Sequence, residues 1–519
     1  MPLDLPLTHT YATLPPRFFQ QVAPTPVGLP AWLAFNHELA AELGIADAAG
    51  VDAEAGLAVF AGNALPPSAR PLAMAYAGHQ FGHFVPQLGD GRAILLGELV
   101  DVHGVRRDLQ LKGAGRTAFS RGGDGRAVVG PVLREVIIGE ALHALGIPTT
   151  RALAAVATGE PVLRDRGPLP GAVLTRVAAS HVRVGTFEFF AARGDVEALR
   201  RLADYVIDRH YPELASAAPH EAALALLRAV SERQAALLAM WMAVGFVHGV
   251  MNTDNMAVSG ESIDFGPCAF LDEYAPGKTF SSIDRHGRYA FANQPVIAQW
   301  NLARLGECLL PLMIAPGSAI PDEAAAVAAA TAELQAFPAR FEAQWQARLR
   351  ARLGLVETRD GDDGLAADLL AAMHAAGADW TLTFRRLAEW VEDGFAAGEA
   401  GAVDPVDAFG AGARAPLPMD PVAPADFLAP WLPRWRERLA AEARPPQQVA
   451  AATRAVAPAV IPRNHQVEAA LRAAEDGELA PFRALLAAVR RPFADDAAQQ
   501  PFIAAPAPAA RVCATFCGT

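Results

Sequence analysis

The amino-acid sequence predicts an α+β protein, in which a strand-rich part with one prominent helix precedes a longer and mostly helical part. Three observations predict this class. Short β-type runs and a single capped helix fall within the first 180 residues, Ala- and Leu-rich segments with few β-branched runs follow from residue 186, and 52% of the 519 residues are hydrophobic. A chain of this length and composition can bury a core for several domains.

The strands are expected in the first part of the chain. Residues 93–100 (AILLGELV) and 105–111 (VRRDLQL) are β-type runs, and Gly104 stands in the short segment between them, which is typical of a hairpin. A third β-type run, GAVLTRV, covers residues 171–177 and follows a loop with Gly and Pro. The first part of the chain is therefore expected to consist mainly of strands.

Helices are indicated by start and stop signals and by long apolar segments. Residues 131–146 predict one helix, because a proline opens this segment and a glycine closes it. Beyond it, the chain becomes rich in Ala and Leu. Further helical segments are expected at residues 196–209, 221–245, 295–314, 322–353 and 465–491.

Composition divides the chain into three expected units. A break is expected near residues 184–190, and the Gly-, Pro- and Ala-rich segment 398–432 is expected to be a linker or long connection. We therefore expect a strand-rich unit over residues 1–185, a helical unit over 186–355, and a helical C-terminal extension over 356–519.

Charge and cysteine content exclude several classes of protein. Lys and Arg total 44 against 56 Asp and Glu, a net charge of −12, so the chain has no overall attraction for nucleic acid. Four cysteines in this length are typical of a reducing compartment. The N-terminus does not resemble a signal peptide, and the longest apolar run, 235–247, is shorter than the roughly 20 residues that cross a bilayer. We expect a soluble, cytoplasmic protein.

A basic segment interrupts this acidic chain. Residues 106–134 hold seven Lys or Arg and two Asp residues, a net charge of +5. Glycines in the same segment would let backbone N–H groups approach phosphate oxygens, so an anion site is one interpretation and a solvated basic face is the other. The sequence Gly-Asp-Gly-Arg-Ala occurs at 89–93 and again at 123–127, where each copy is either a phosphate loop or an ordinary tight turn.

A loop motif with metal-binding spacing follows the apolar run, whose helix is expected to end at Val247. Residues 248–256 read His-Gly-Val-Met-Asn-Thr-Asp-Asn-Met, and Asp264 follows in Ile-Asp-Phe-Gly, nine residues past Asn255. Kinase-like phosphotransferases place His-Arg-Asp or His-Gly-Asp in this loop, an Asn five residues after that Asp, and a second Asp in Asp-Phe-Gly. Asn255 and Asp264 are therefore expected to bind the Mg²⁺ that bridges nucleotide phosphates, and Mn²⁺ suits the same oxygen ligands.

The motif departs from the kinase pattern at one position. Val250 stands where an aspartate would accept the proton of the substrate hydroxyl, and valine cannot accept it. Either the chain binds a nucleotide without chemistry, or the base lies elsewhere, and Asp254 is the nearest carboxylate in the loop. His248 is expected to be a core histidine that bonds the loop backbone rather than a catalytic group.

A kinase-like site also needs a strand lysine that is positioned by a helix carboxylate. Lys112 ends the second strand of the predicted hairpin, and Glu135 and Glu140 both lie on the following helix. That helix is apolar on most sides, so a carboxylate on it gains by meeting a cation from another element. An exposed position is the alternative for either glutamate.

Longer segments of the chain closely resemble the selenoprotein O family, with its bacterial YdiU-type relatives. The resemblance covers nearly the whole chain and is far more specific than any single motif. The segments that carry it are GHQFGHF (78–84), QLGDGRA (87–93), LQLKGAGRTAFSRGGDGRA (109–127), LREVIIGEALHALGIPTTRAL (133–153), HVRVGTFE (181–188), HGVMNTDNM (248–256), DFGPCAFLDEY (264–274), DRHGRYAF (284–291) and NHQVEAALRAAEDGEL (464–479).

The resemblance implies a protein-kinase-like fold of two lobes that looks like a pseudokinase, with a helical C-terminal extension. It also implies transfer of AMP from ATP to hydroxyl side chains of proteins, with release of pyrophosphate. In that family the nucleotide is inverted relative to kinases, so that the α-phosphate meets the acceptor. Transfer of UMP from UTP is also attributed to bacterial members.

The resemblance further implies a role for each matching position. Asp254 corresponds to the proton acceptor, and Asn255 and Asp264 correspond to the metal ligands, Asp264 also contacting the nucleotide. Lys112 resembles the phosphate-binding lysine, with Glu135 rather than Glu140 as its helix partner. The remaining nucleotide-binding positions implied are Gly89, Gly91, Arg92, Asp124, Gly125, and the two arginines that hold the inverted nucleotide, Arg176 and Arg183.

The C-terminal tail, residues 492–519, is expected to be extended and matches the family in part. Cys517 stands where the family carries selenocysteine or cysteine. In some relatives this residue pairs with a cysteine at a place that aligns with Phe280, so that partner is missing here. Cys513 is a substitute partner on one interpretation, and an unpaired tail thiol is the other. Cys268 and Cys308 are expected to be buried.

Three hypotheses of function follow from the sequence. The first is an adenylyltransferase that acts on Ser, Thr or Tyr of other proteins, and the second is a phosphotransferase that uses Asp254 as its base. The third is a nucleotide-binding scaffold without catalysis, which the metal pair argues against. The expected partners are ATP, with UTP as an alternative, and protein substrates, in a monomer that binds neither nucleic acid nor membrane.

Overall fold

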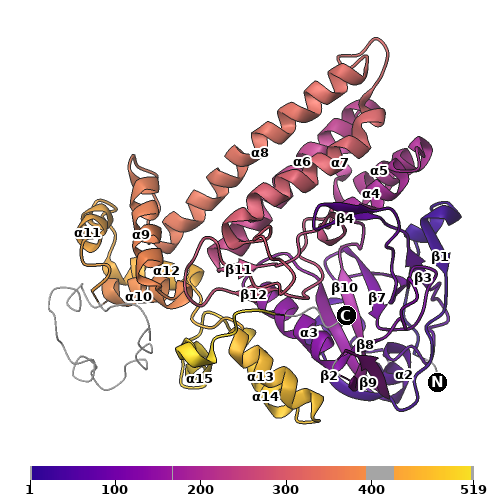
Figure 1. Cartoon of the computed structure of the whole chain (residues 1–519), viewed down its shortest axis with the longest axis horizontal. Coiled ribbons are helices and arrows are strands. Elements are labelled where there is room, and N and C mark those ends of the chain that lie inside the picture. The colour runs from indigo at the N-terminus through magenta and orange to yellow at the C-terminus, as the bar shows by residue number, and fades with distance from the viewer. Residues whose placement is uncertain (1–2, 49, 166, 393–425, 516–519) are drawn as a thin grey trace.

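The computed structural model describes residues 3–48, 50–165, 167–392 and 426–515. It shows a mixed α/β protein in which an antiparallel sheet is formed by the first 180 residues and most of the remainder is helical (Figure 1). The predicted α+β class is therefore confirmed at this level.

The main sheet has eight strands in the order β1-β3-β6-β7-β10-β9-β2, with β8 pairing to β10, and every pairing is antiparallel. A separate hairpin of β4 and β5 lies outside this sheet. The strand bounds are β1 Phe19–Gln21, β2 Ala31–Phe35, β3 Leu72–Met74, β4 Gly78–Gln80, β5 His83–Val85, β6 Ala93–Val100, β7 Arg106–Lys112, β8 Ala127–Val128, β9 Arg151–Arg164 and β10 Gly167–Ala178.

The predicted hairpin is confirmed, and a longer hairpin, formed by β9 and β10, was not predicted. Strands β6 and β7 pair from Ala93 opposite Lys112 to Val100 opposite Arg106, with one register shift between Leu95 and Gly97. Gly104 has the positive φ of +79° that the turn needs. The run predicted at 171–177 lies inside β10, whose partner β9 was not predicted. Because β9 is rich in alanine, which has low strand propensity, its sequence gives little strand signal.

Helix α3, Val129–Ala144, confirms the helix predicted at 131–146 and packs on one face of the sheet. Its apolar side chains share a core with β9, β10 and two C-terminal helices, α13 (Asn464–Glu475) and α14 (Ala480–Val489). The other face of the sheet is covered by α1 (His37–Glu42) and α2 (Glu54–Phe60). Helix α3 is thus buried on nearly every side, which explains its apolar sequence.

The predicted helical segments all contain helices. Helix α6 packs against α7 and α8, and α8, of 30 residues, projects as the longest rod of the molecule (Figure 1). The bounds are α4 Val184–Ala191, α5 Val196–His210, α6 Pro219–Ala243, α7 Gln294–Met313, α8 Glu323–Arg352, α9 Asp362–Ala376, α10 Trp380–Glu392, α11 Leu432–Ala440, α12 Pro446–Val456 and α15 Gln500–Ile503.

The helix expected to end at Val247 ends earlier. Helix α6 stops at Ala243, and the next residues turn through Gly245, whose φ is +75°, into the short strand β11, Phe246–Val247. Strand β11 pairs with β12, Ala269–Phe270. A Cβ atom at position 245 would lie 2.7 Å from the Trp380 ring, so glycine permits both the turn and the packing.

Three further expectations meet the structure in part. Residues 184–190, where the break between units is expected, lie in helix α4, which is buried along most of its length. Most of the predicted linker 398–432 lies outside the described residues. The tail expected to be extended contains the short helix α15. Among the helices that the structure describes, none is both long and apolar enough to cross a membrane.

Candidate active site

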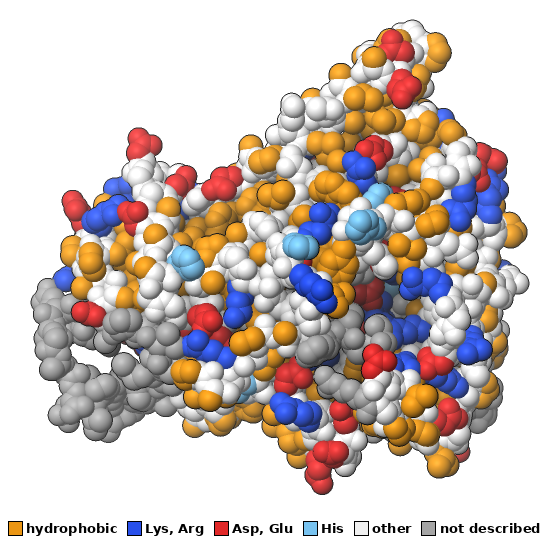
Figure 2. Space-filling model, viewed as in Figure 1, with side chains coloured by type: hydrophobic (Ala, Val, Ile, Leu, Met, Phe, Trp, Pro, Cys, Tyr) orange, Lys and Arg blue, Asp and Glu red, His pale blue; other side chains and the backbone are white. Residues whose placement is uncertain are grey.

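A cavity of about 530 Å³ opens between the sheet, helix α3 and the loops that follow α6. Its lining comes from residues as far apart in sequence as Tyr76 and Pro267, and Figure 2 shows the hollow on one face of the molecule. Every nucleotide, metal and catalytic residue implied by the resemblance lines it: Gly89, Gly91, Arg92, Lys112, Asp124, Gly125, Glu135, Arg176, Arg183, Asp254, Asn255 and Asp264.

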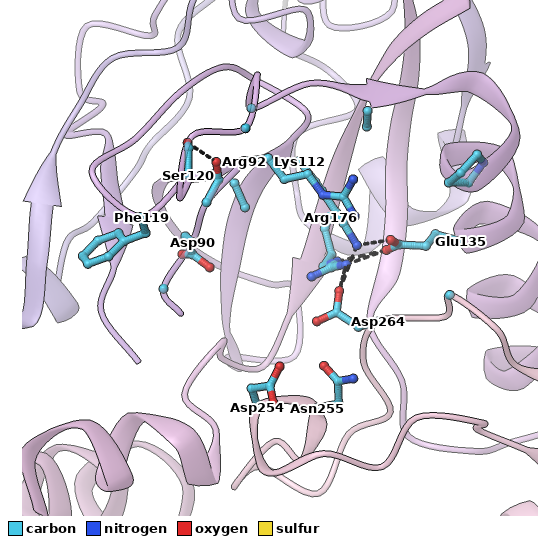
Figure 3. Close-up of a pocket in the computed structure, with 18 of the residues that line it drawn as sticks. Asp90, Arg92, Lys112, Phe119, Ser120, Glu135, Arg176, Asp254, Asn255 and Asp264 are labelled. Carbon is cyan, nitrogen blue, oxygen red and sulfur yellow. Dashed lines mark hydrogen bonds and ion pairs between the residues drawn. The ribbon is translucent and has the colours of Figure 1, made fainter. Parts of the chain in front are cut away.

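Two carboxylates and two cations form a closed network on the inner wall (Figure 3). Lys112, at the end of β7, contacts Glu135 of α3, and its Nζ lies 2.8 Å from Asp264 Oδ1. Arg176, from β10, reaches the same two carboxylates, with Nη2 at 2.6 Å from Glu135 Oε2 and from Asp264 Oδ1. Of the two glutamates left open by the sequence, Glu135 is therefore the partner of Lys112. Glu140 pairs with Arg151 and Arg490 instead.

Asp264 is held charged in an unusual backbone conformation. Its φ is +63°, a left-handed value that is costly for a residue with a Cβ atom. Burial would raise its pKa, but Arg176, Lys112 and Arg183 together hold the pKa well below its ordinary value. Its Oδ1 is shared by the two closest cations, whereas Oδ2 has only a contact of 3.5 Å to Arg183. Oδ2 is therefore the oxygen that remains available to a ligand.

Arg183 links the sheet side of the cavity to the loop that carries Asp254 and Asn255. Its Nη1 donates to the carbonyl of Asp254 at 3.1 Å, and its Nε donates to the carbonyl of His181 at 3.1 Å. Its guanidinium also lies over the ring of Tyr76, 4.3 Å from the centroid. His181 is in turn fixed by Asp108, which accepts from its backbone N–H. The guanidinium is thus held rigidly at the cavity wall.

Asp254 is a buried carboxylate whose hydrogen bonding is incomplete. It is 7% exposed, and its Oδ1 has no hydrogen-bond partner among the described residues. Its Oδ2 accepts only a long bond of 3.4 Å from Gln80 Nε2. Burial raises its pKa to about 7, although Arg183 opposes the shift. A carboxyl with these properties can exchange a proton near neutral pH.

The position that kinases fill with a base is an apolar wall here. Val250 lines the cavity and is 8% exposed, and its carbonyl accepts from Asn255 Nδ2 at 2.9 Å. His248 is fully buried, stacks on Trp241 and contacts the Ile263 carbonyl through Nε2 at 2.8 Å. The expectation that His248 is a core histidine is therefore confirmed.

The two Gly-Asp-Gly copies meet at the outer rim of the cavity. Gly89 has a φ of +70°, and a Cβ atom there would lie 2.2 Å from the Phe119 ring. Gly125 has a φ of +71°, and a Cβ atom there would lie 2.2 Å from the backbone of Gly115. Both positions thus require glycine. Asp124 is exposed and pairs with Arg164 at 2.7 Å, which fixes the second loop against β9.

The donor set suits a hard divalent cation shared with phosphates. The amide oxygen of Asn255 points toward Asp264 (Figure 3), because its Nδ2 is occupied by the Val250 carbonyl. Within the described chain, no group of three or more His, Cys, Asp or Glu residues could hold a metal alone. A pair of oxygen ligands that leaves the remaining positions to phosphates and water is the arrangement that Mg²⁺ favours. The residues therefore fit the ion.

Several lining residues were not singled out as site residues. Asp90 lies between the two glycines of the first loop, buried, and accepts from Gln110 Nε2 at 3.2 Å. Tyr76 and Gln80 belong to the segment around β4 and carry no charge that sequence reasoning would notice. Four arginines also line the outer part of the cavity: Arg121, Arg126, Arg134 and Arg164.

The basic segment 106–134 supplies three of these arginines, so the anion-site interpretation of that segment has a geometric basis. Lys112 of the same segment lies on the inner wall, whereas other members of the segment do not line the cavity. Arg106 pairs with Glu98 at 3.3 Å, and Arg107 pairs with Asp101 at 3.0 Å. The net charge of the segment indicated the cavity, but it did not distinguish lining arginines from structural ones.

The cysteines of the tail are only partly described. Cys517 lies outside the described residues, and Cys513 is exposed. Cys268 and Cys308 are buried, as expected. The tail reaches the loop after Asp264 through Thr515, whose N–H donates to the Phe280 carbonyl at 2.7 Å. Phe280 is the position that the resemblance aligns with the partner cysteine of some relatives.

Comparison with known proteins identifies relatives over the full length. The family model described as "Protein adenylyltransferase SelO" matches residues 2–490. A protein of Rhizobium rhizogenes named "Protein nucleotidyltransferase YdiU" is 56% identical over 516 residues, which cover 99% of this chain and 97% of that protein. A protein of the same name from a Bradyrhizobium species is 55% identical over 524 residues, covering 100% of both chains.

Proposed function

The chain belongs to the SelO family and is a protein nucleotidyltransferase, and from this premise we propose that it transfers AMP from ATP to the hydroxyl groups of Ser, Thr or Tyr in other proteins. The acceptor oxygen forms a bond to the α-phosphorus, and the bond from that phosphorus to the β-phosphate oxygen breaks. Pyrophosphate leaves, and the hydroxyl proton passes to a base. UTP is a second nucleotide substrate under this proposal.

One observation carries the proposal: Val250 forms the wall where a kinase has its base, while Asp254 presents an unpartnered carboxylate oxygen nearby. If ATP lies inverted, the reacting phosphorus is the innermost one and the kinase base position no longer faces the acceptor. Asp254 would then orient the hydroxyl or take its proton, a contribution of about 10²- to 10⁴-fold. Its burial and raised pKa support this role.

The cations of the inner wall would bind the phosphates. Lys112, Arg176 and Arg183 face two carboxylates, Glu135 and Asp264, so the wall has a net charge of +1 before any ligand binds. Such preorganised cations stabilise charge that builds up on the phosphates and on leaving pyrophosphate. Asn255 and Asp264 would hold Mg²⁺ or Mn²⁺, which supplies further charge neutralisation at the phosphates when bound.

The proposal includes the finer fold. The sheet, α3 and the Lys112–Glu135 pair suit the small lobe of a protein-kinase-like fold, and α4 to α8 with the loop of Asp254 suit the large lobe. We propose the same unit boundaries as expected from sequence, 1–185, 186–355 and 356–519. Residues at the first boundary form α4, so the chain crosses between the units within ordered structure.

Two labelled nucleotides test the reaction. Protein incubated with Mg²⁺ and a mixture of acceptor proteins should retain label from ATP marked on the α-phosphate and none from ATP marked on the γ-phosphate. Intact-mass measurement should show the addition of one AMP to the modified protein, and Asp254→Asn should abolish it. Asp476→Asn, an exposed carboxylate of the α13 terminus, is the matched control and should behave as wild type.

Two outcomes would contradict the proposal. Retention of γ-label alone would identify a phosphotransferase that uses Asp254 as its base. Turnover at background level with Mg²⁺ or Mn²⁺ present, unchanged by Asp254→Asn, would identify a nucleotide-binding scaffold.

A further inference from the structure

We propose that the surface next to Asp254 made by His79, His83, Phe84, Arg285, Arg288 and Trp300, here called the hairpin face, docks an acidic segment of the acceptor protein. This proposal rests on the proposed function, because it names the class of acceptor that the same site would take. Three observations support it. They are the contacts of the β4–β5 hairpin, the exposed aromatic and apolar side chains of the surface, and the positive charge of Arg285 and Arg288.

The hairpin is attached directly to the catalytic loop. The N–H of His79 donates to Thr253 Oγ1 at 2.7 Å, and Gln80 Nε2 reaches Asp254 at 3.4 Å. Gly78 lies so close that a Cβ atom there would be 2.6 Å from Asp254 Oδ1. A segment that lies on the outer side of this hairpin is therefore within a few side-chain lengths of the carboxylate that would receive the acceptor hydroxyl.

The segment before and within α7 completes the surface. Tyr289 Oη donates to Asn252 Oδ1 at 2.6 Å, which ties this segment to the same loop. The Arg288 guanidinium lies 4.8 Å from the Trp300 ring centroid, and the His79 ring lies 5.2 Å from that centroid. The aromatic rings thus fix the positions of the cationic group and the hairpin relative to each other.

The surface is accessible and partly apolar. Phe84, on β5, is 40% exposed, and Ile283, beside Arg285, is 61% exposed. His83, Arg285 and His286 are also exposed. Aromatic side chains and arginines are the residue types that contribute most to protein–protein binding. A side chain next to the acceptor hydroxyl could be buried against Phe84.

The charge of the surface sets the class of partner. Residues 76–89 contain no Asp or Glu, and the His79 ring contacts the buried Glu188. Residues 275–306 contain four Lys or Arg and one acid, Asp284. Two of the four basic residues, Lys278 and Arg304, pair with Glu273 and Glu307, so the cations without a carboxylate partner among the described residues are Arg285 and Arg288. Asp284 is buried, and its carboxylate accepts hydrogen bonds from the backbone N–H groups of Arg288 and Tyr289. Within the described chain, no carboxylate lies within ion-pair distance of Arg285 or Arg288. Figure 2 shows Lys, Arg and His side chains gathered beside the hollow.

This local excess of positive charge stands out in a protein whose net charge is −12. Unpaired cations beside a reaction site attract a partner of opposite charge and exclude a basic one. The hairpin face lies beside Asp254, whereas the arginines of the outer cavity line it together with the Gly-Asp-Gly loops, where they would face the phosphates of the proposed nucleotide. An acidic acceptor segment is the occupant that this charge fits.

Three peptides test the docking surface. Each carries one serine in a flexible sequence with an aromatic residue, flanked by glutamates, by glutamines or by lysines. Binding to the full chain is measured by fluorescence anisotropy with ADP and Mg²⁺ present, and AMP transfer is measured separately by peptide mass with ATP. The glutamate peptide should bind at least about tenfold more tightly than the lysine peptide, and its affinity should fall as salt is raised.

A charge reversal locates the effect. The double variant Arg285→Glu/His286→Glu should weaken binding of the glutamate peptide by about tenfold and strengthen binding of the lysine peptide. Arg483→Glu, an exposed residue of α14 on the far side of α3, is the matched control and should leave both affinities unchanged. Binding of ATP to the double variant reports whether the cavity is intact.

The two proposals fail in different ways. Equal affinity for the three peptides, or an unchanged glutamate-peptide affinity in the double variant, would overturn the docking proposal even if AMP transfer occurs. Selective binding of the glutamate peptide without any AMP transfer to peptide or protein would support the docking surface and contradict the proposed function.

Discussion

The inner wall of the cavity shows how single residues share one task. Asp264 and Glu135 would each be costly to bury alone, and Lys112 and Arg176 bridge both of them. The network holds the two cationic groups in fixed positions at the cavity wall, so that their positive charge faces the cavity. Removal of either carboxylate would leave Lys112 and Arg176 to share the remaining one, so both carboxylates are needed to keep the site in shape.

Val250→Asp is the residue change that best separates an inverted nucleotide from a kinase-like one. It restores the side chain of the kinase pattern at a position that is 8% exposed on the cavity wall. Because the reacting phosphorus would lie elsewhere, the variant should gain no transfer of the γ-phosphate. AMP transfer should fall, since a new carboxylate near Asn255 and Asp264 competes for the metal.

The measurement for this variant is label transfer from ATP marked at each phosphate. Val250→Asn, of similar size but uncharged, is the control for the loss of packing. A clear rise in γ-phosphate transfer in Val250→Asp, absent from Val250→Asn, would show that the outermost phosphorus can face this position and would contradict the inverted orientation.

Arg352, at the end of α8, is a buried cation, and the cost of burying its charge can be measured as a change in stability. None of its three guanidinium nitrogens has a hydrogen-bond partner among the described residues, and burial lowers its pKa to about 9. Two ring contacts compensate in part, with the Phe384 centroid at 3.9 Å and the Trp380 centroid at 5.6 Å. Arg352→Met should therefore raise the free energy of unfolding by about 1–3 kcal/mol, because it removes a poorly solvated charge and keeps the packing volume.

Urea unfolding of the wild type and of Arg352→Met gives this difference, with Arg352→Lys as the control that retains a charge. A lower free energy of unfolding for the methionine variant would mean that the ring contacts outweigh the cost of burying the charge.

At the residue scale, sequence reasoning predicted charged residues better than neutral ones. Asn255 and Asp264 follow from spacing. Asp254, Lys112 and the two candidate glutamates follow from what a kinase-like site requires, and the remaining cavity residues came from the resemblance. Tyr76 and Gln80 were assigned no role, because a neutral side chain gives no sign of its function even where, as for Gln80, it lies in a segment that carries the resemblance. The choice of Glu135 over Glu140 depends on which turn of α3 faces Lys112, and only the resemblance favoured it before the ion pairs were seen.

At the scale of elements, the strongest local signals were also the most accurate. Strand β6 has the bounds that the sequence predicts, and α3 begins and ends within two residues of them. Strand β9 was not predicted, because its alanines give no clear alternation of apolar and polar side chains. It is a strand because it pairs along its length with β10, which its local sequence does not indicate. The end of α6 was placed too late because an apolar helix and a buried apolar strand follow each other without a polar interruption.

The last residue of α5 predicts a pH dependence of stability. His210 is 8% exposed, its Nε2 lies 2.8 Å from Ser180 Oγ, and burial together with Arg209 and Arg233 lowers its pKa to about 3. In the unfolded chain this histidine binds a proton near pH 6.5, whereas in the folded chain it does not. Its contribution to stability is therefore fully present above pH 6.5 and is lost as the pH falls toward 3. Between pH 8 and pH 5, this group should lower the free energy of unfolding by about 2 kcal/mol.

The measurement is the free energy of unfolding at several pH values for the wild type and for His210→Gln, whose amide can still bond Ser180. The variant should lose less stability between pH 8 and pH 5 than the wild type. Parallel pH profiles for the two proteins would mean that the histidine is protonated in the folded state and would contradict the argument from burial.

At the scale of the whole molecule, the cavity is built from segments that no local pattern connects. Its lining extends from Tyr76 to Pro267 and joins the sheet, α3 and the loops after α6. The C-terminal helices α13 and α14 cover α3 from outside, so the last part of the chain supports the helix that carries Glu135. Sequence reasoning could predict the parts of the site, but their convergence depended on the fold or on a relative.

Because the cavity joins these segments, nucleotide binding should stabilise the whole fold. ATP at about 100 times its Kd should raise the free energy of unfolding by about 2.7 kcal/mol, since only the folded chain has the site. Addition of Mg²⁺ should increase the shift in unfolding temperature further, because Asn255 and Asp264 would hold the ion beside the phosphates. Asn255→Ala removes one oxygen ligand without changing the charge, so the ATP-dependent shift should remain while the Mg²⁺-dependent increment disappears. Asn255→Asp, which keeps an oxygen ligand, should retain that increment. An undiminished increment in Asn255→Ala would place the ion away from this pair, independently of any measurement of activity.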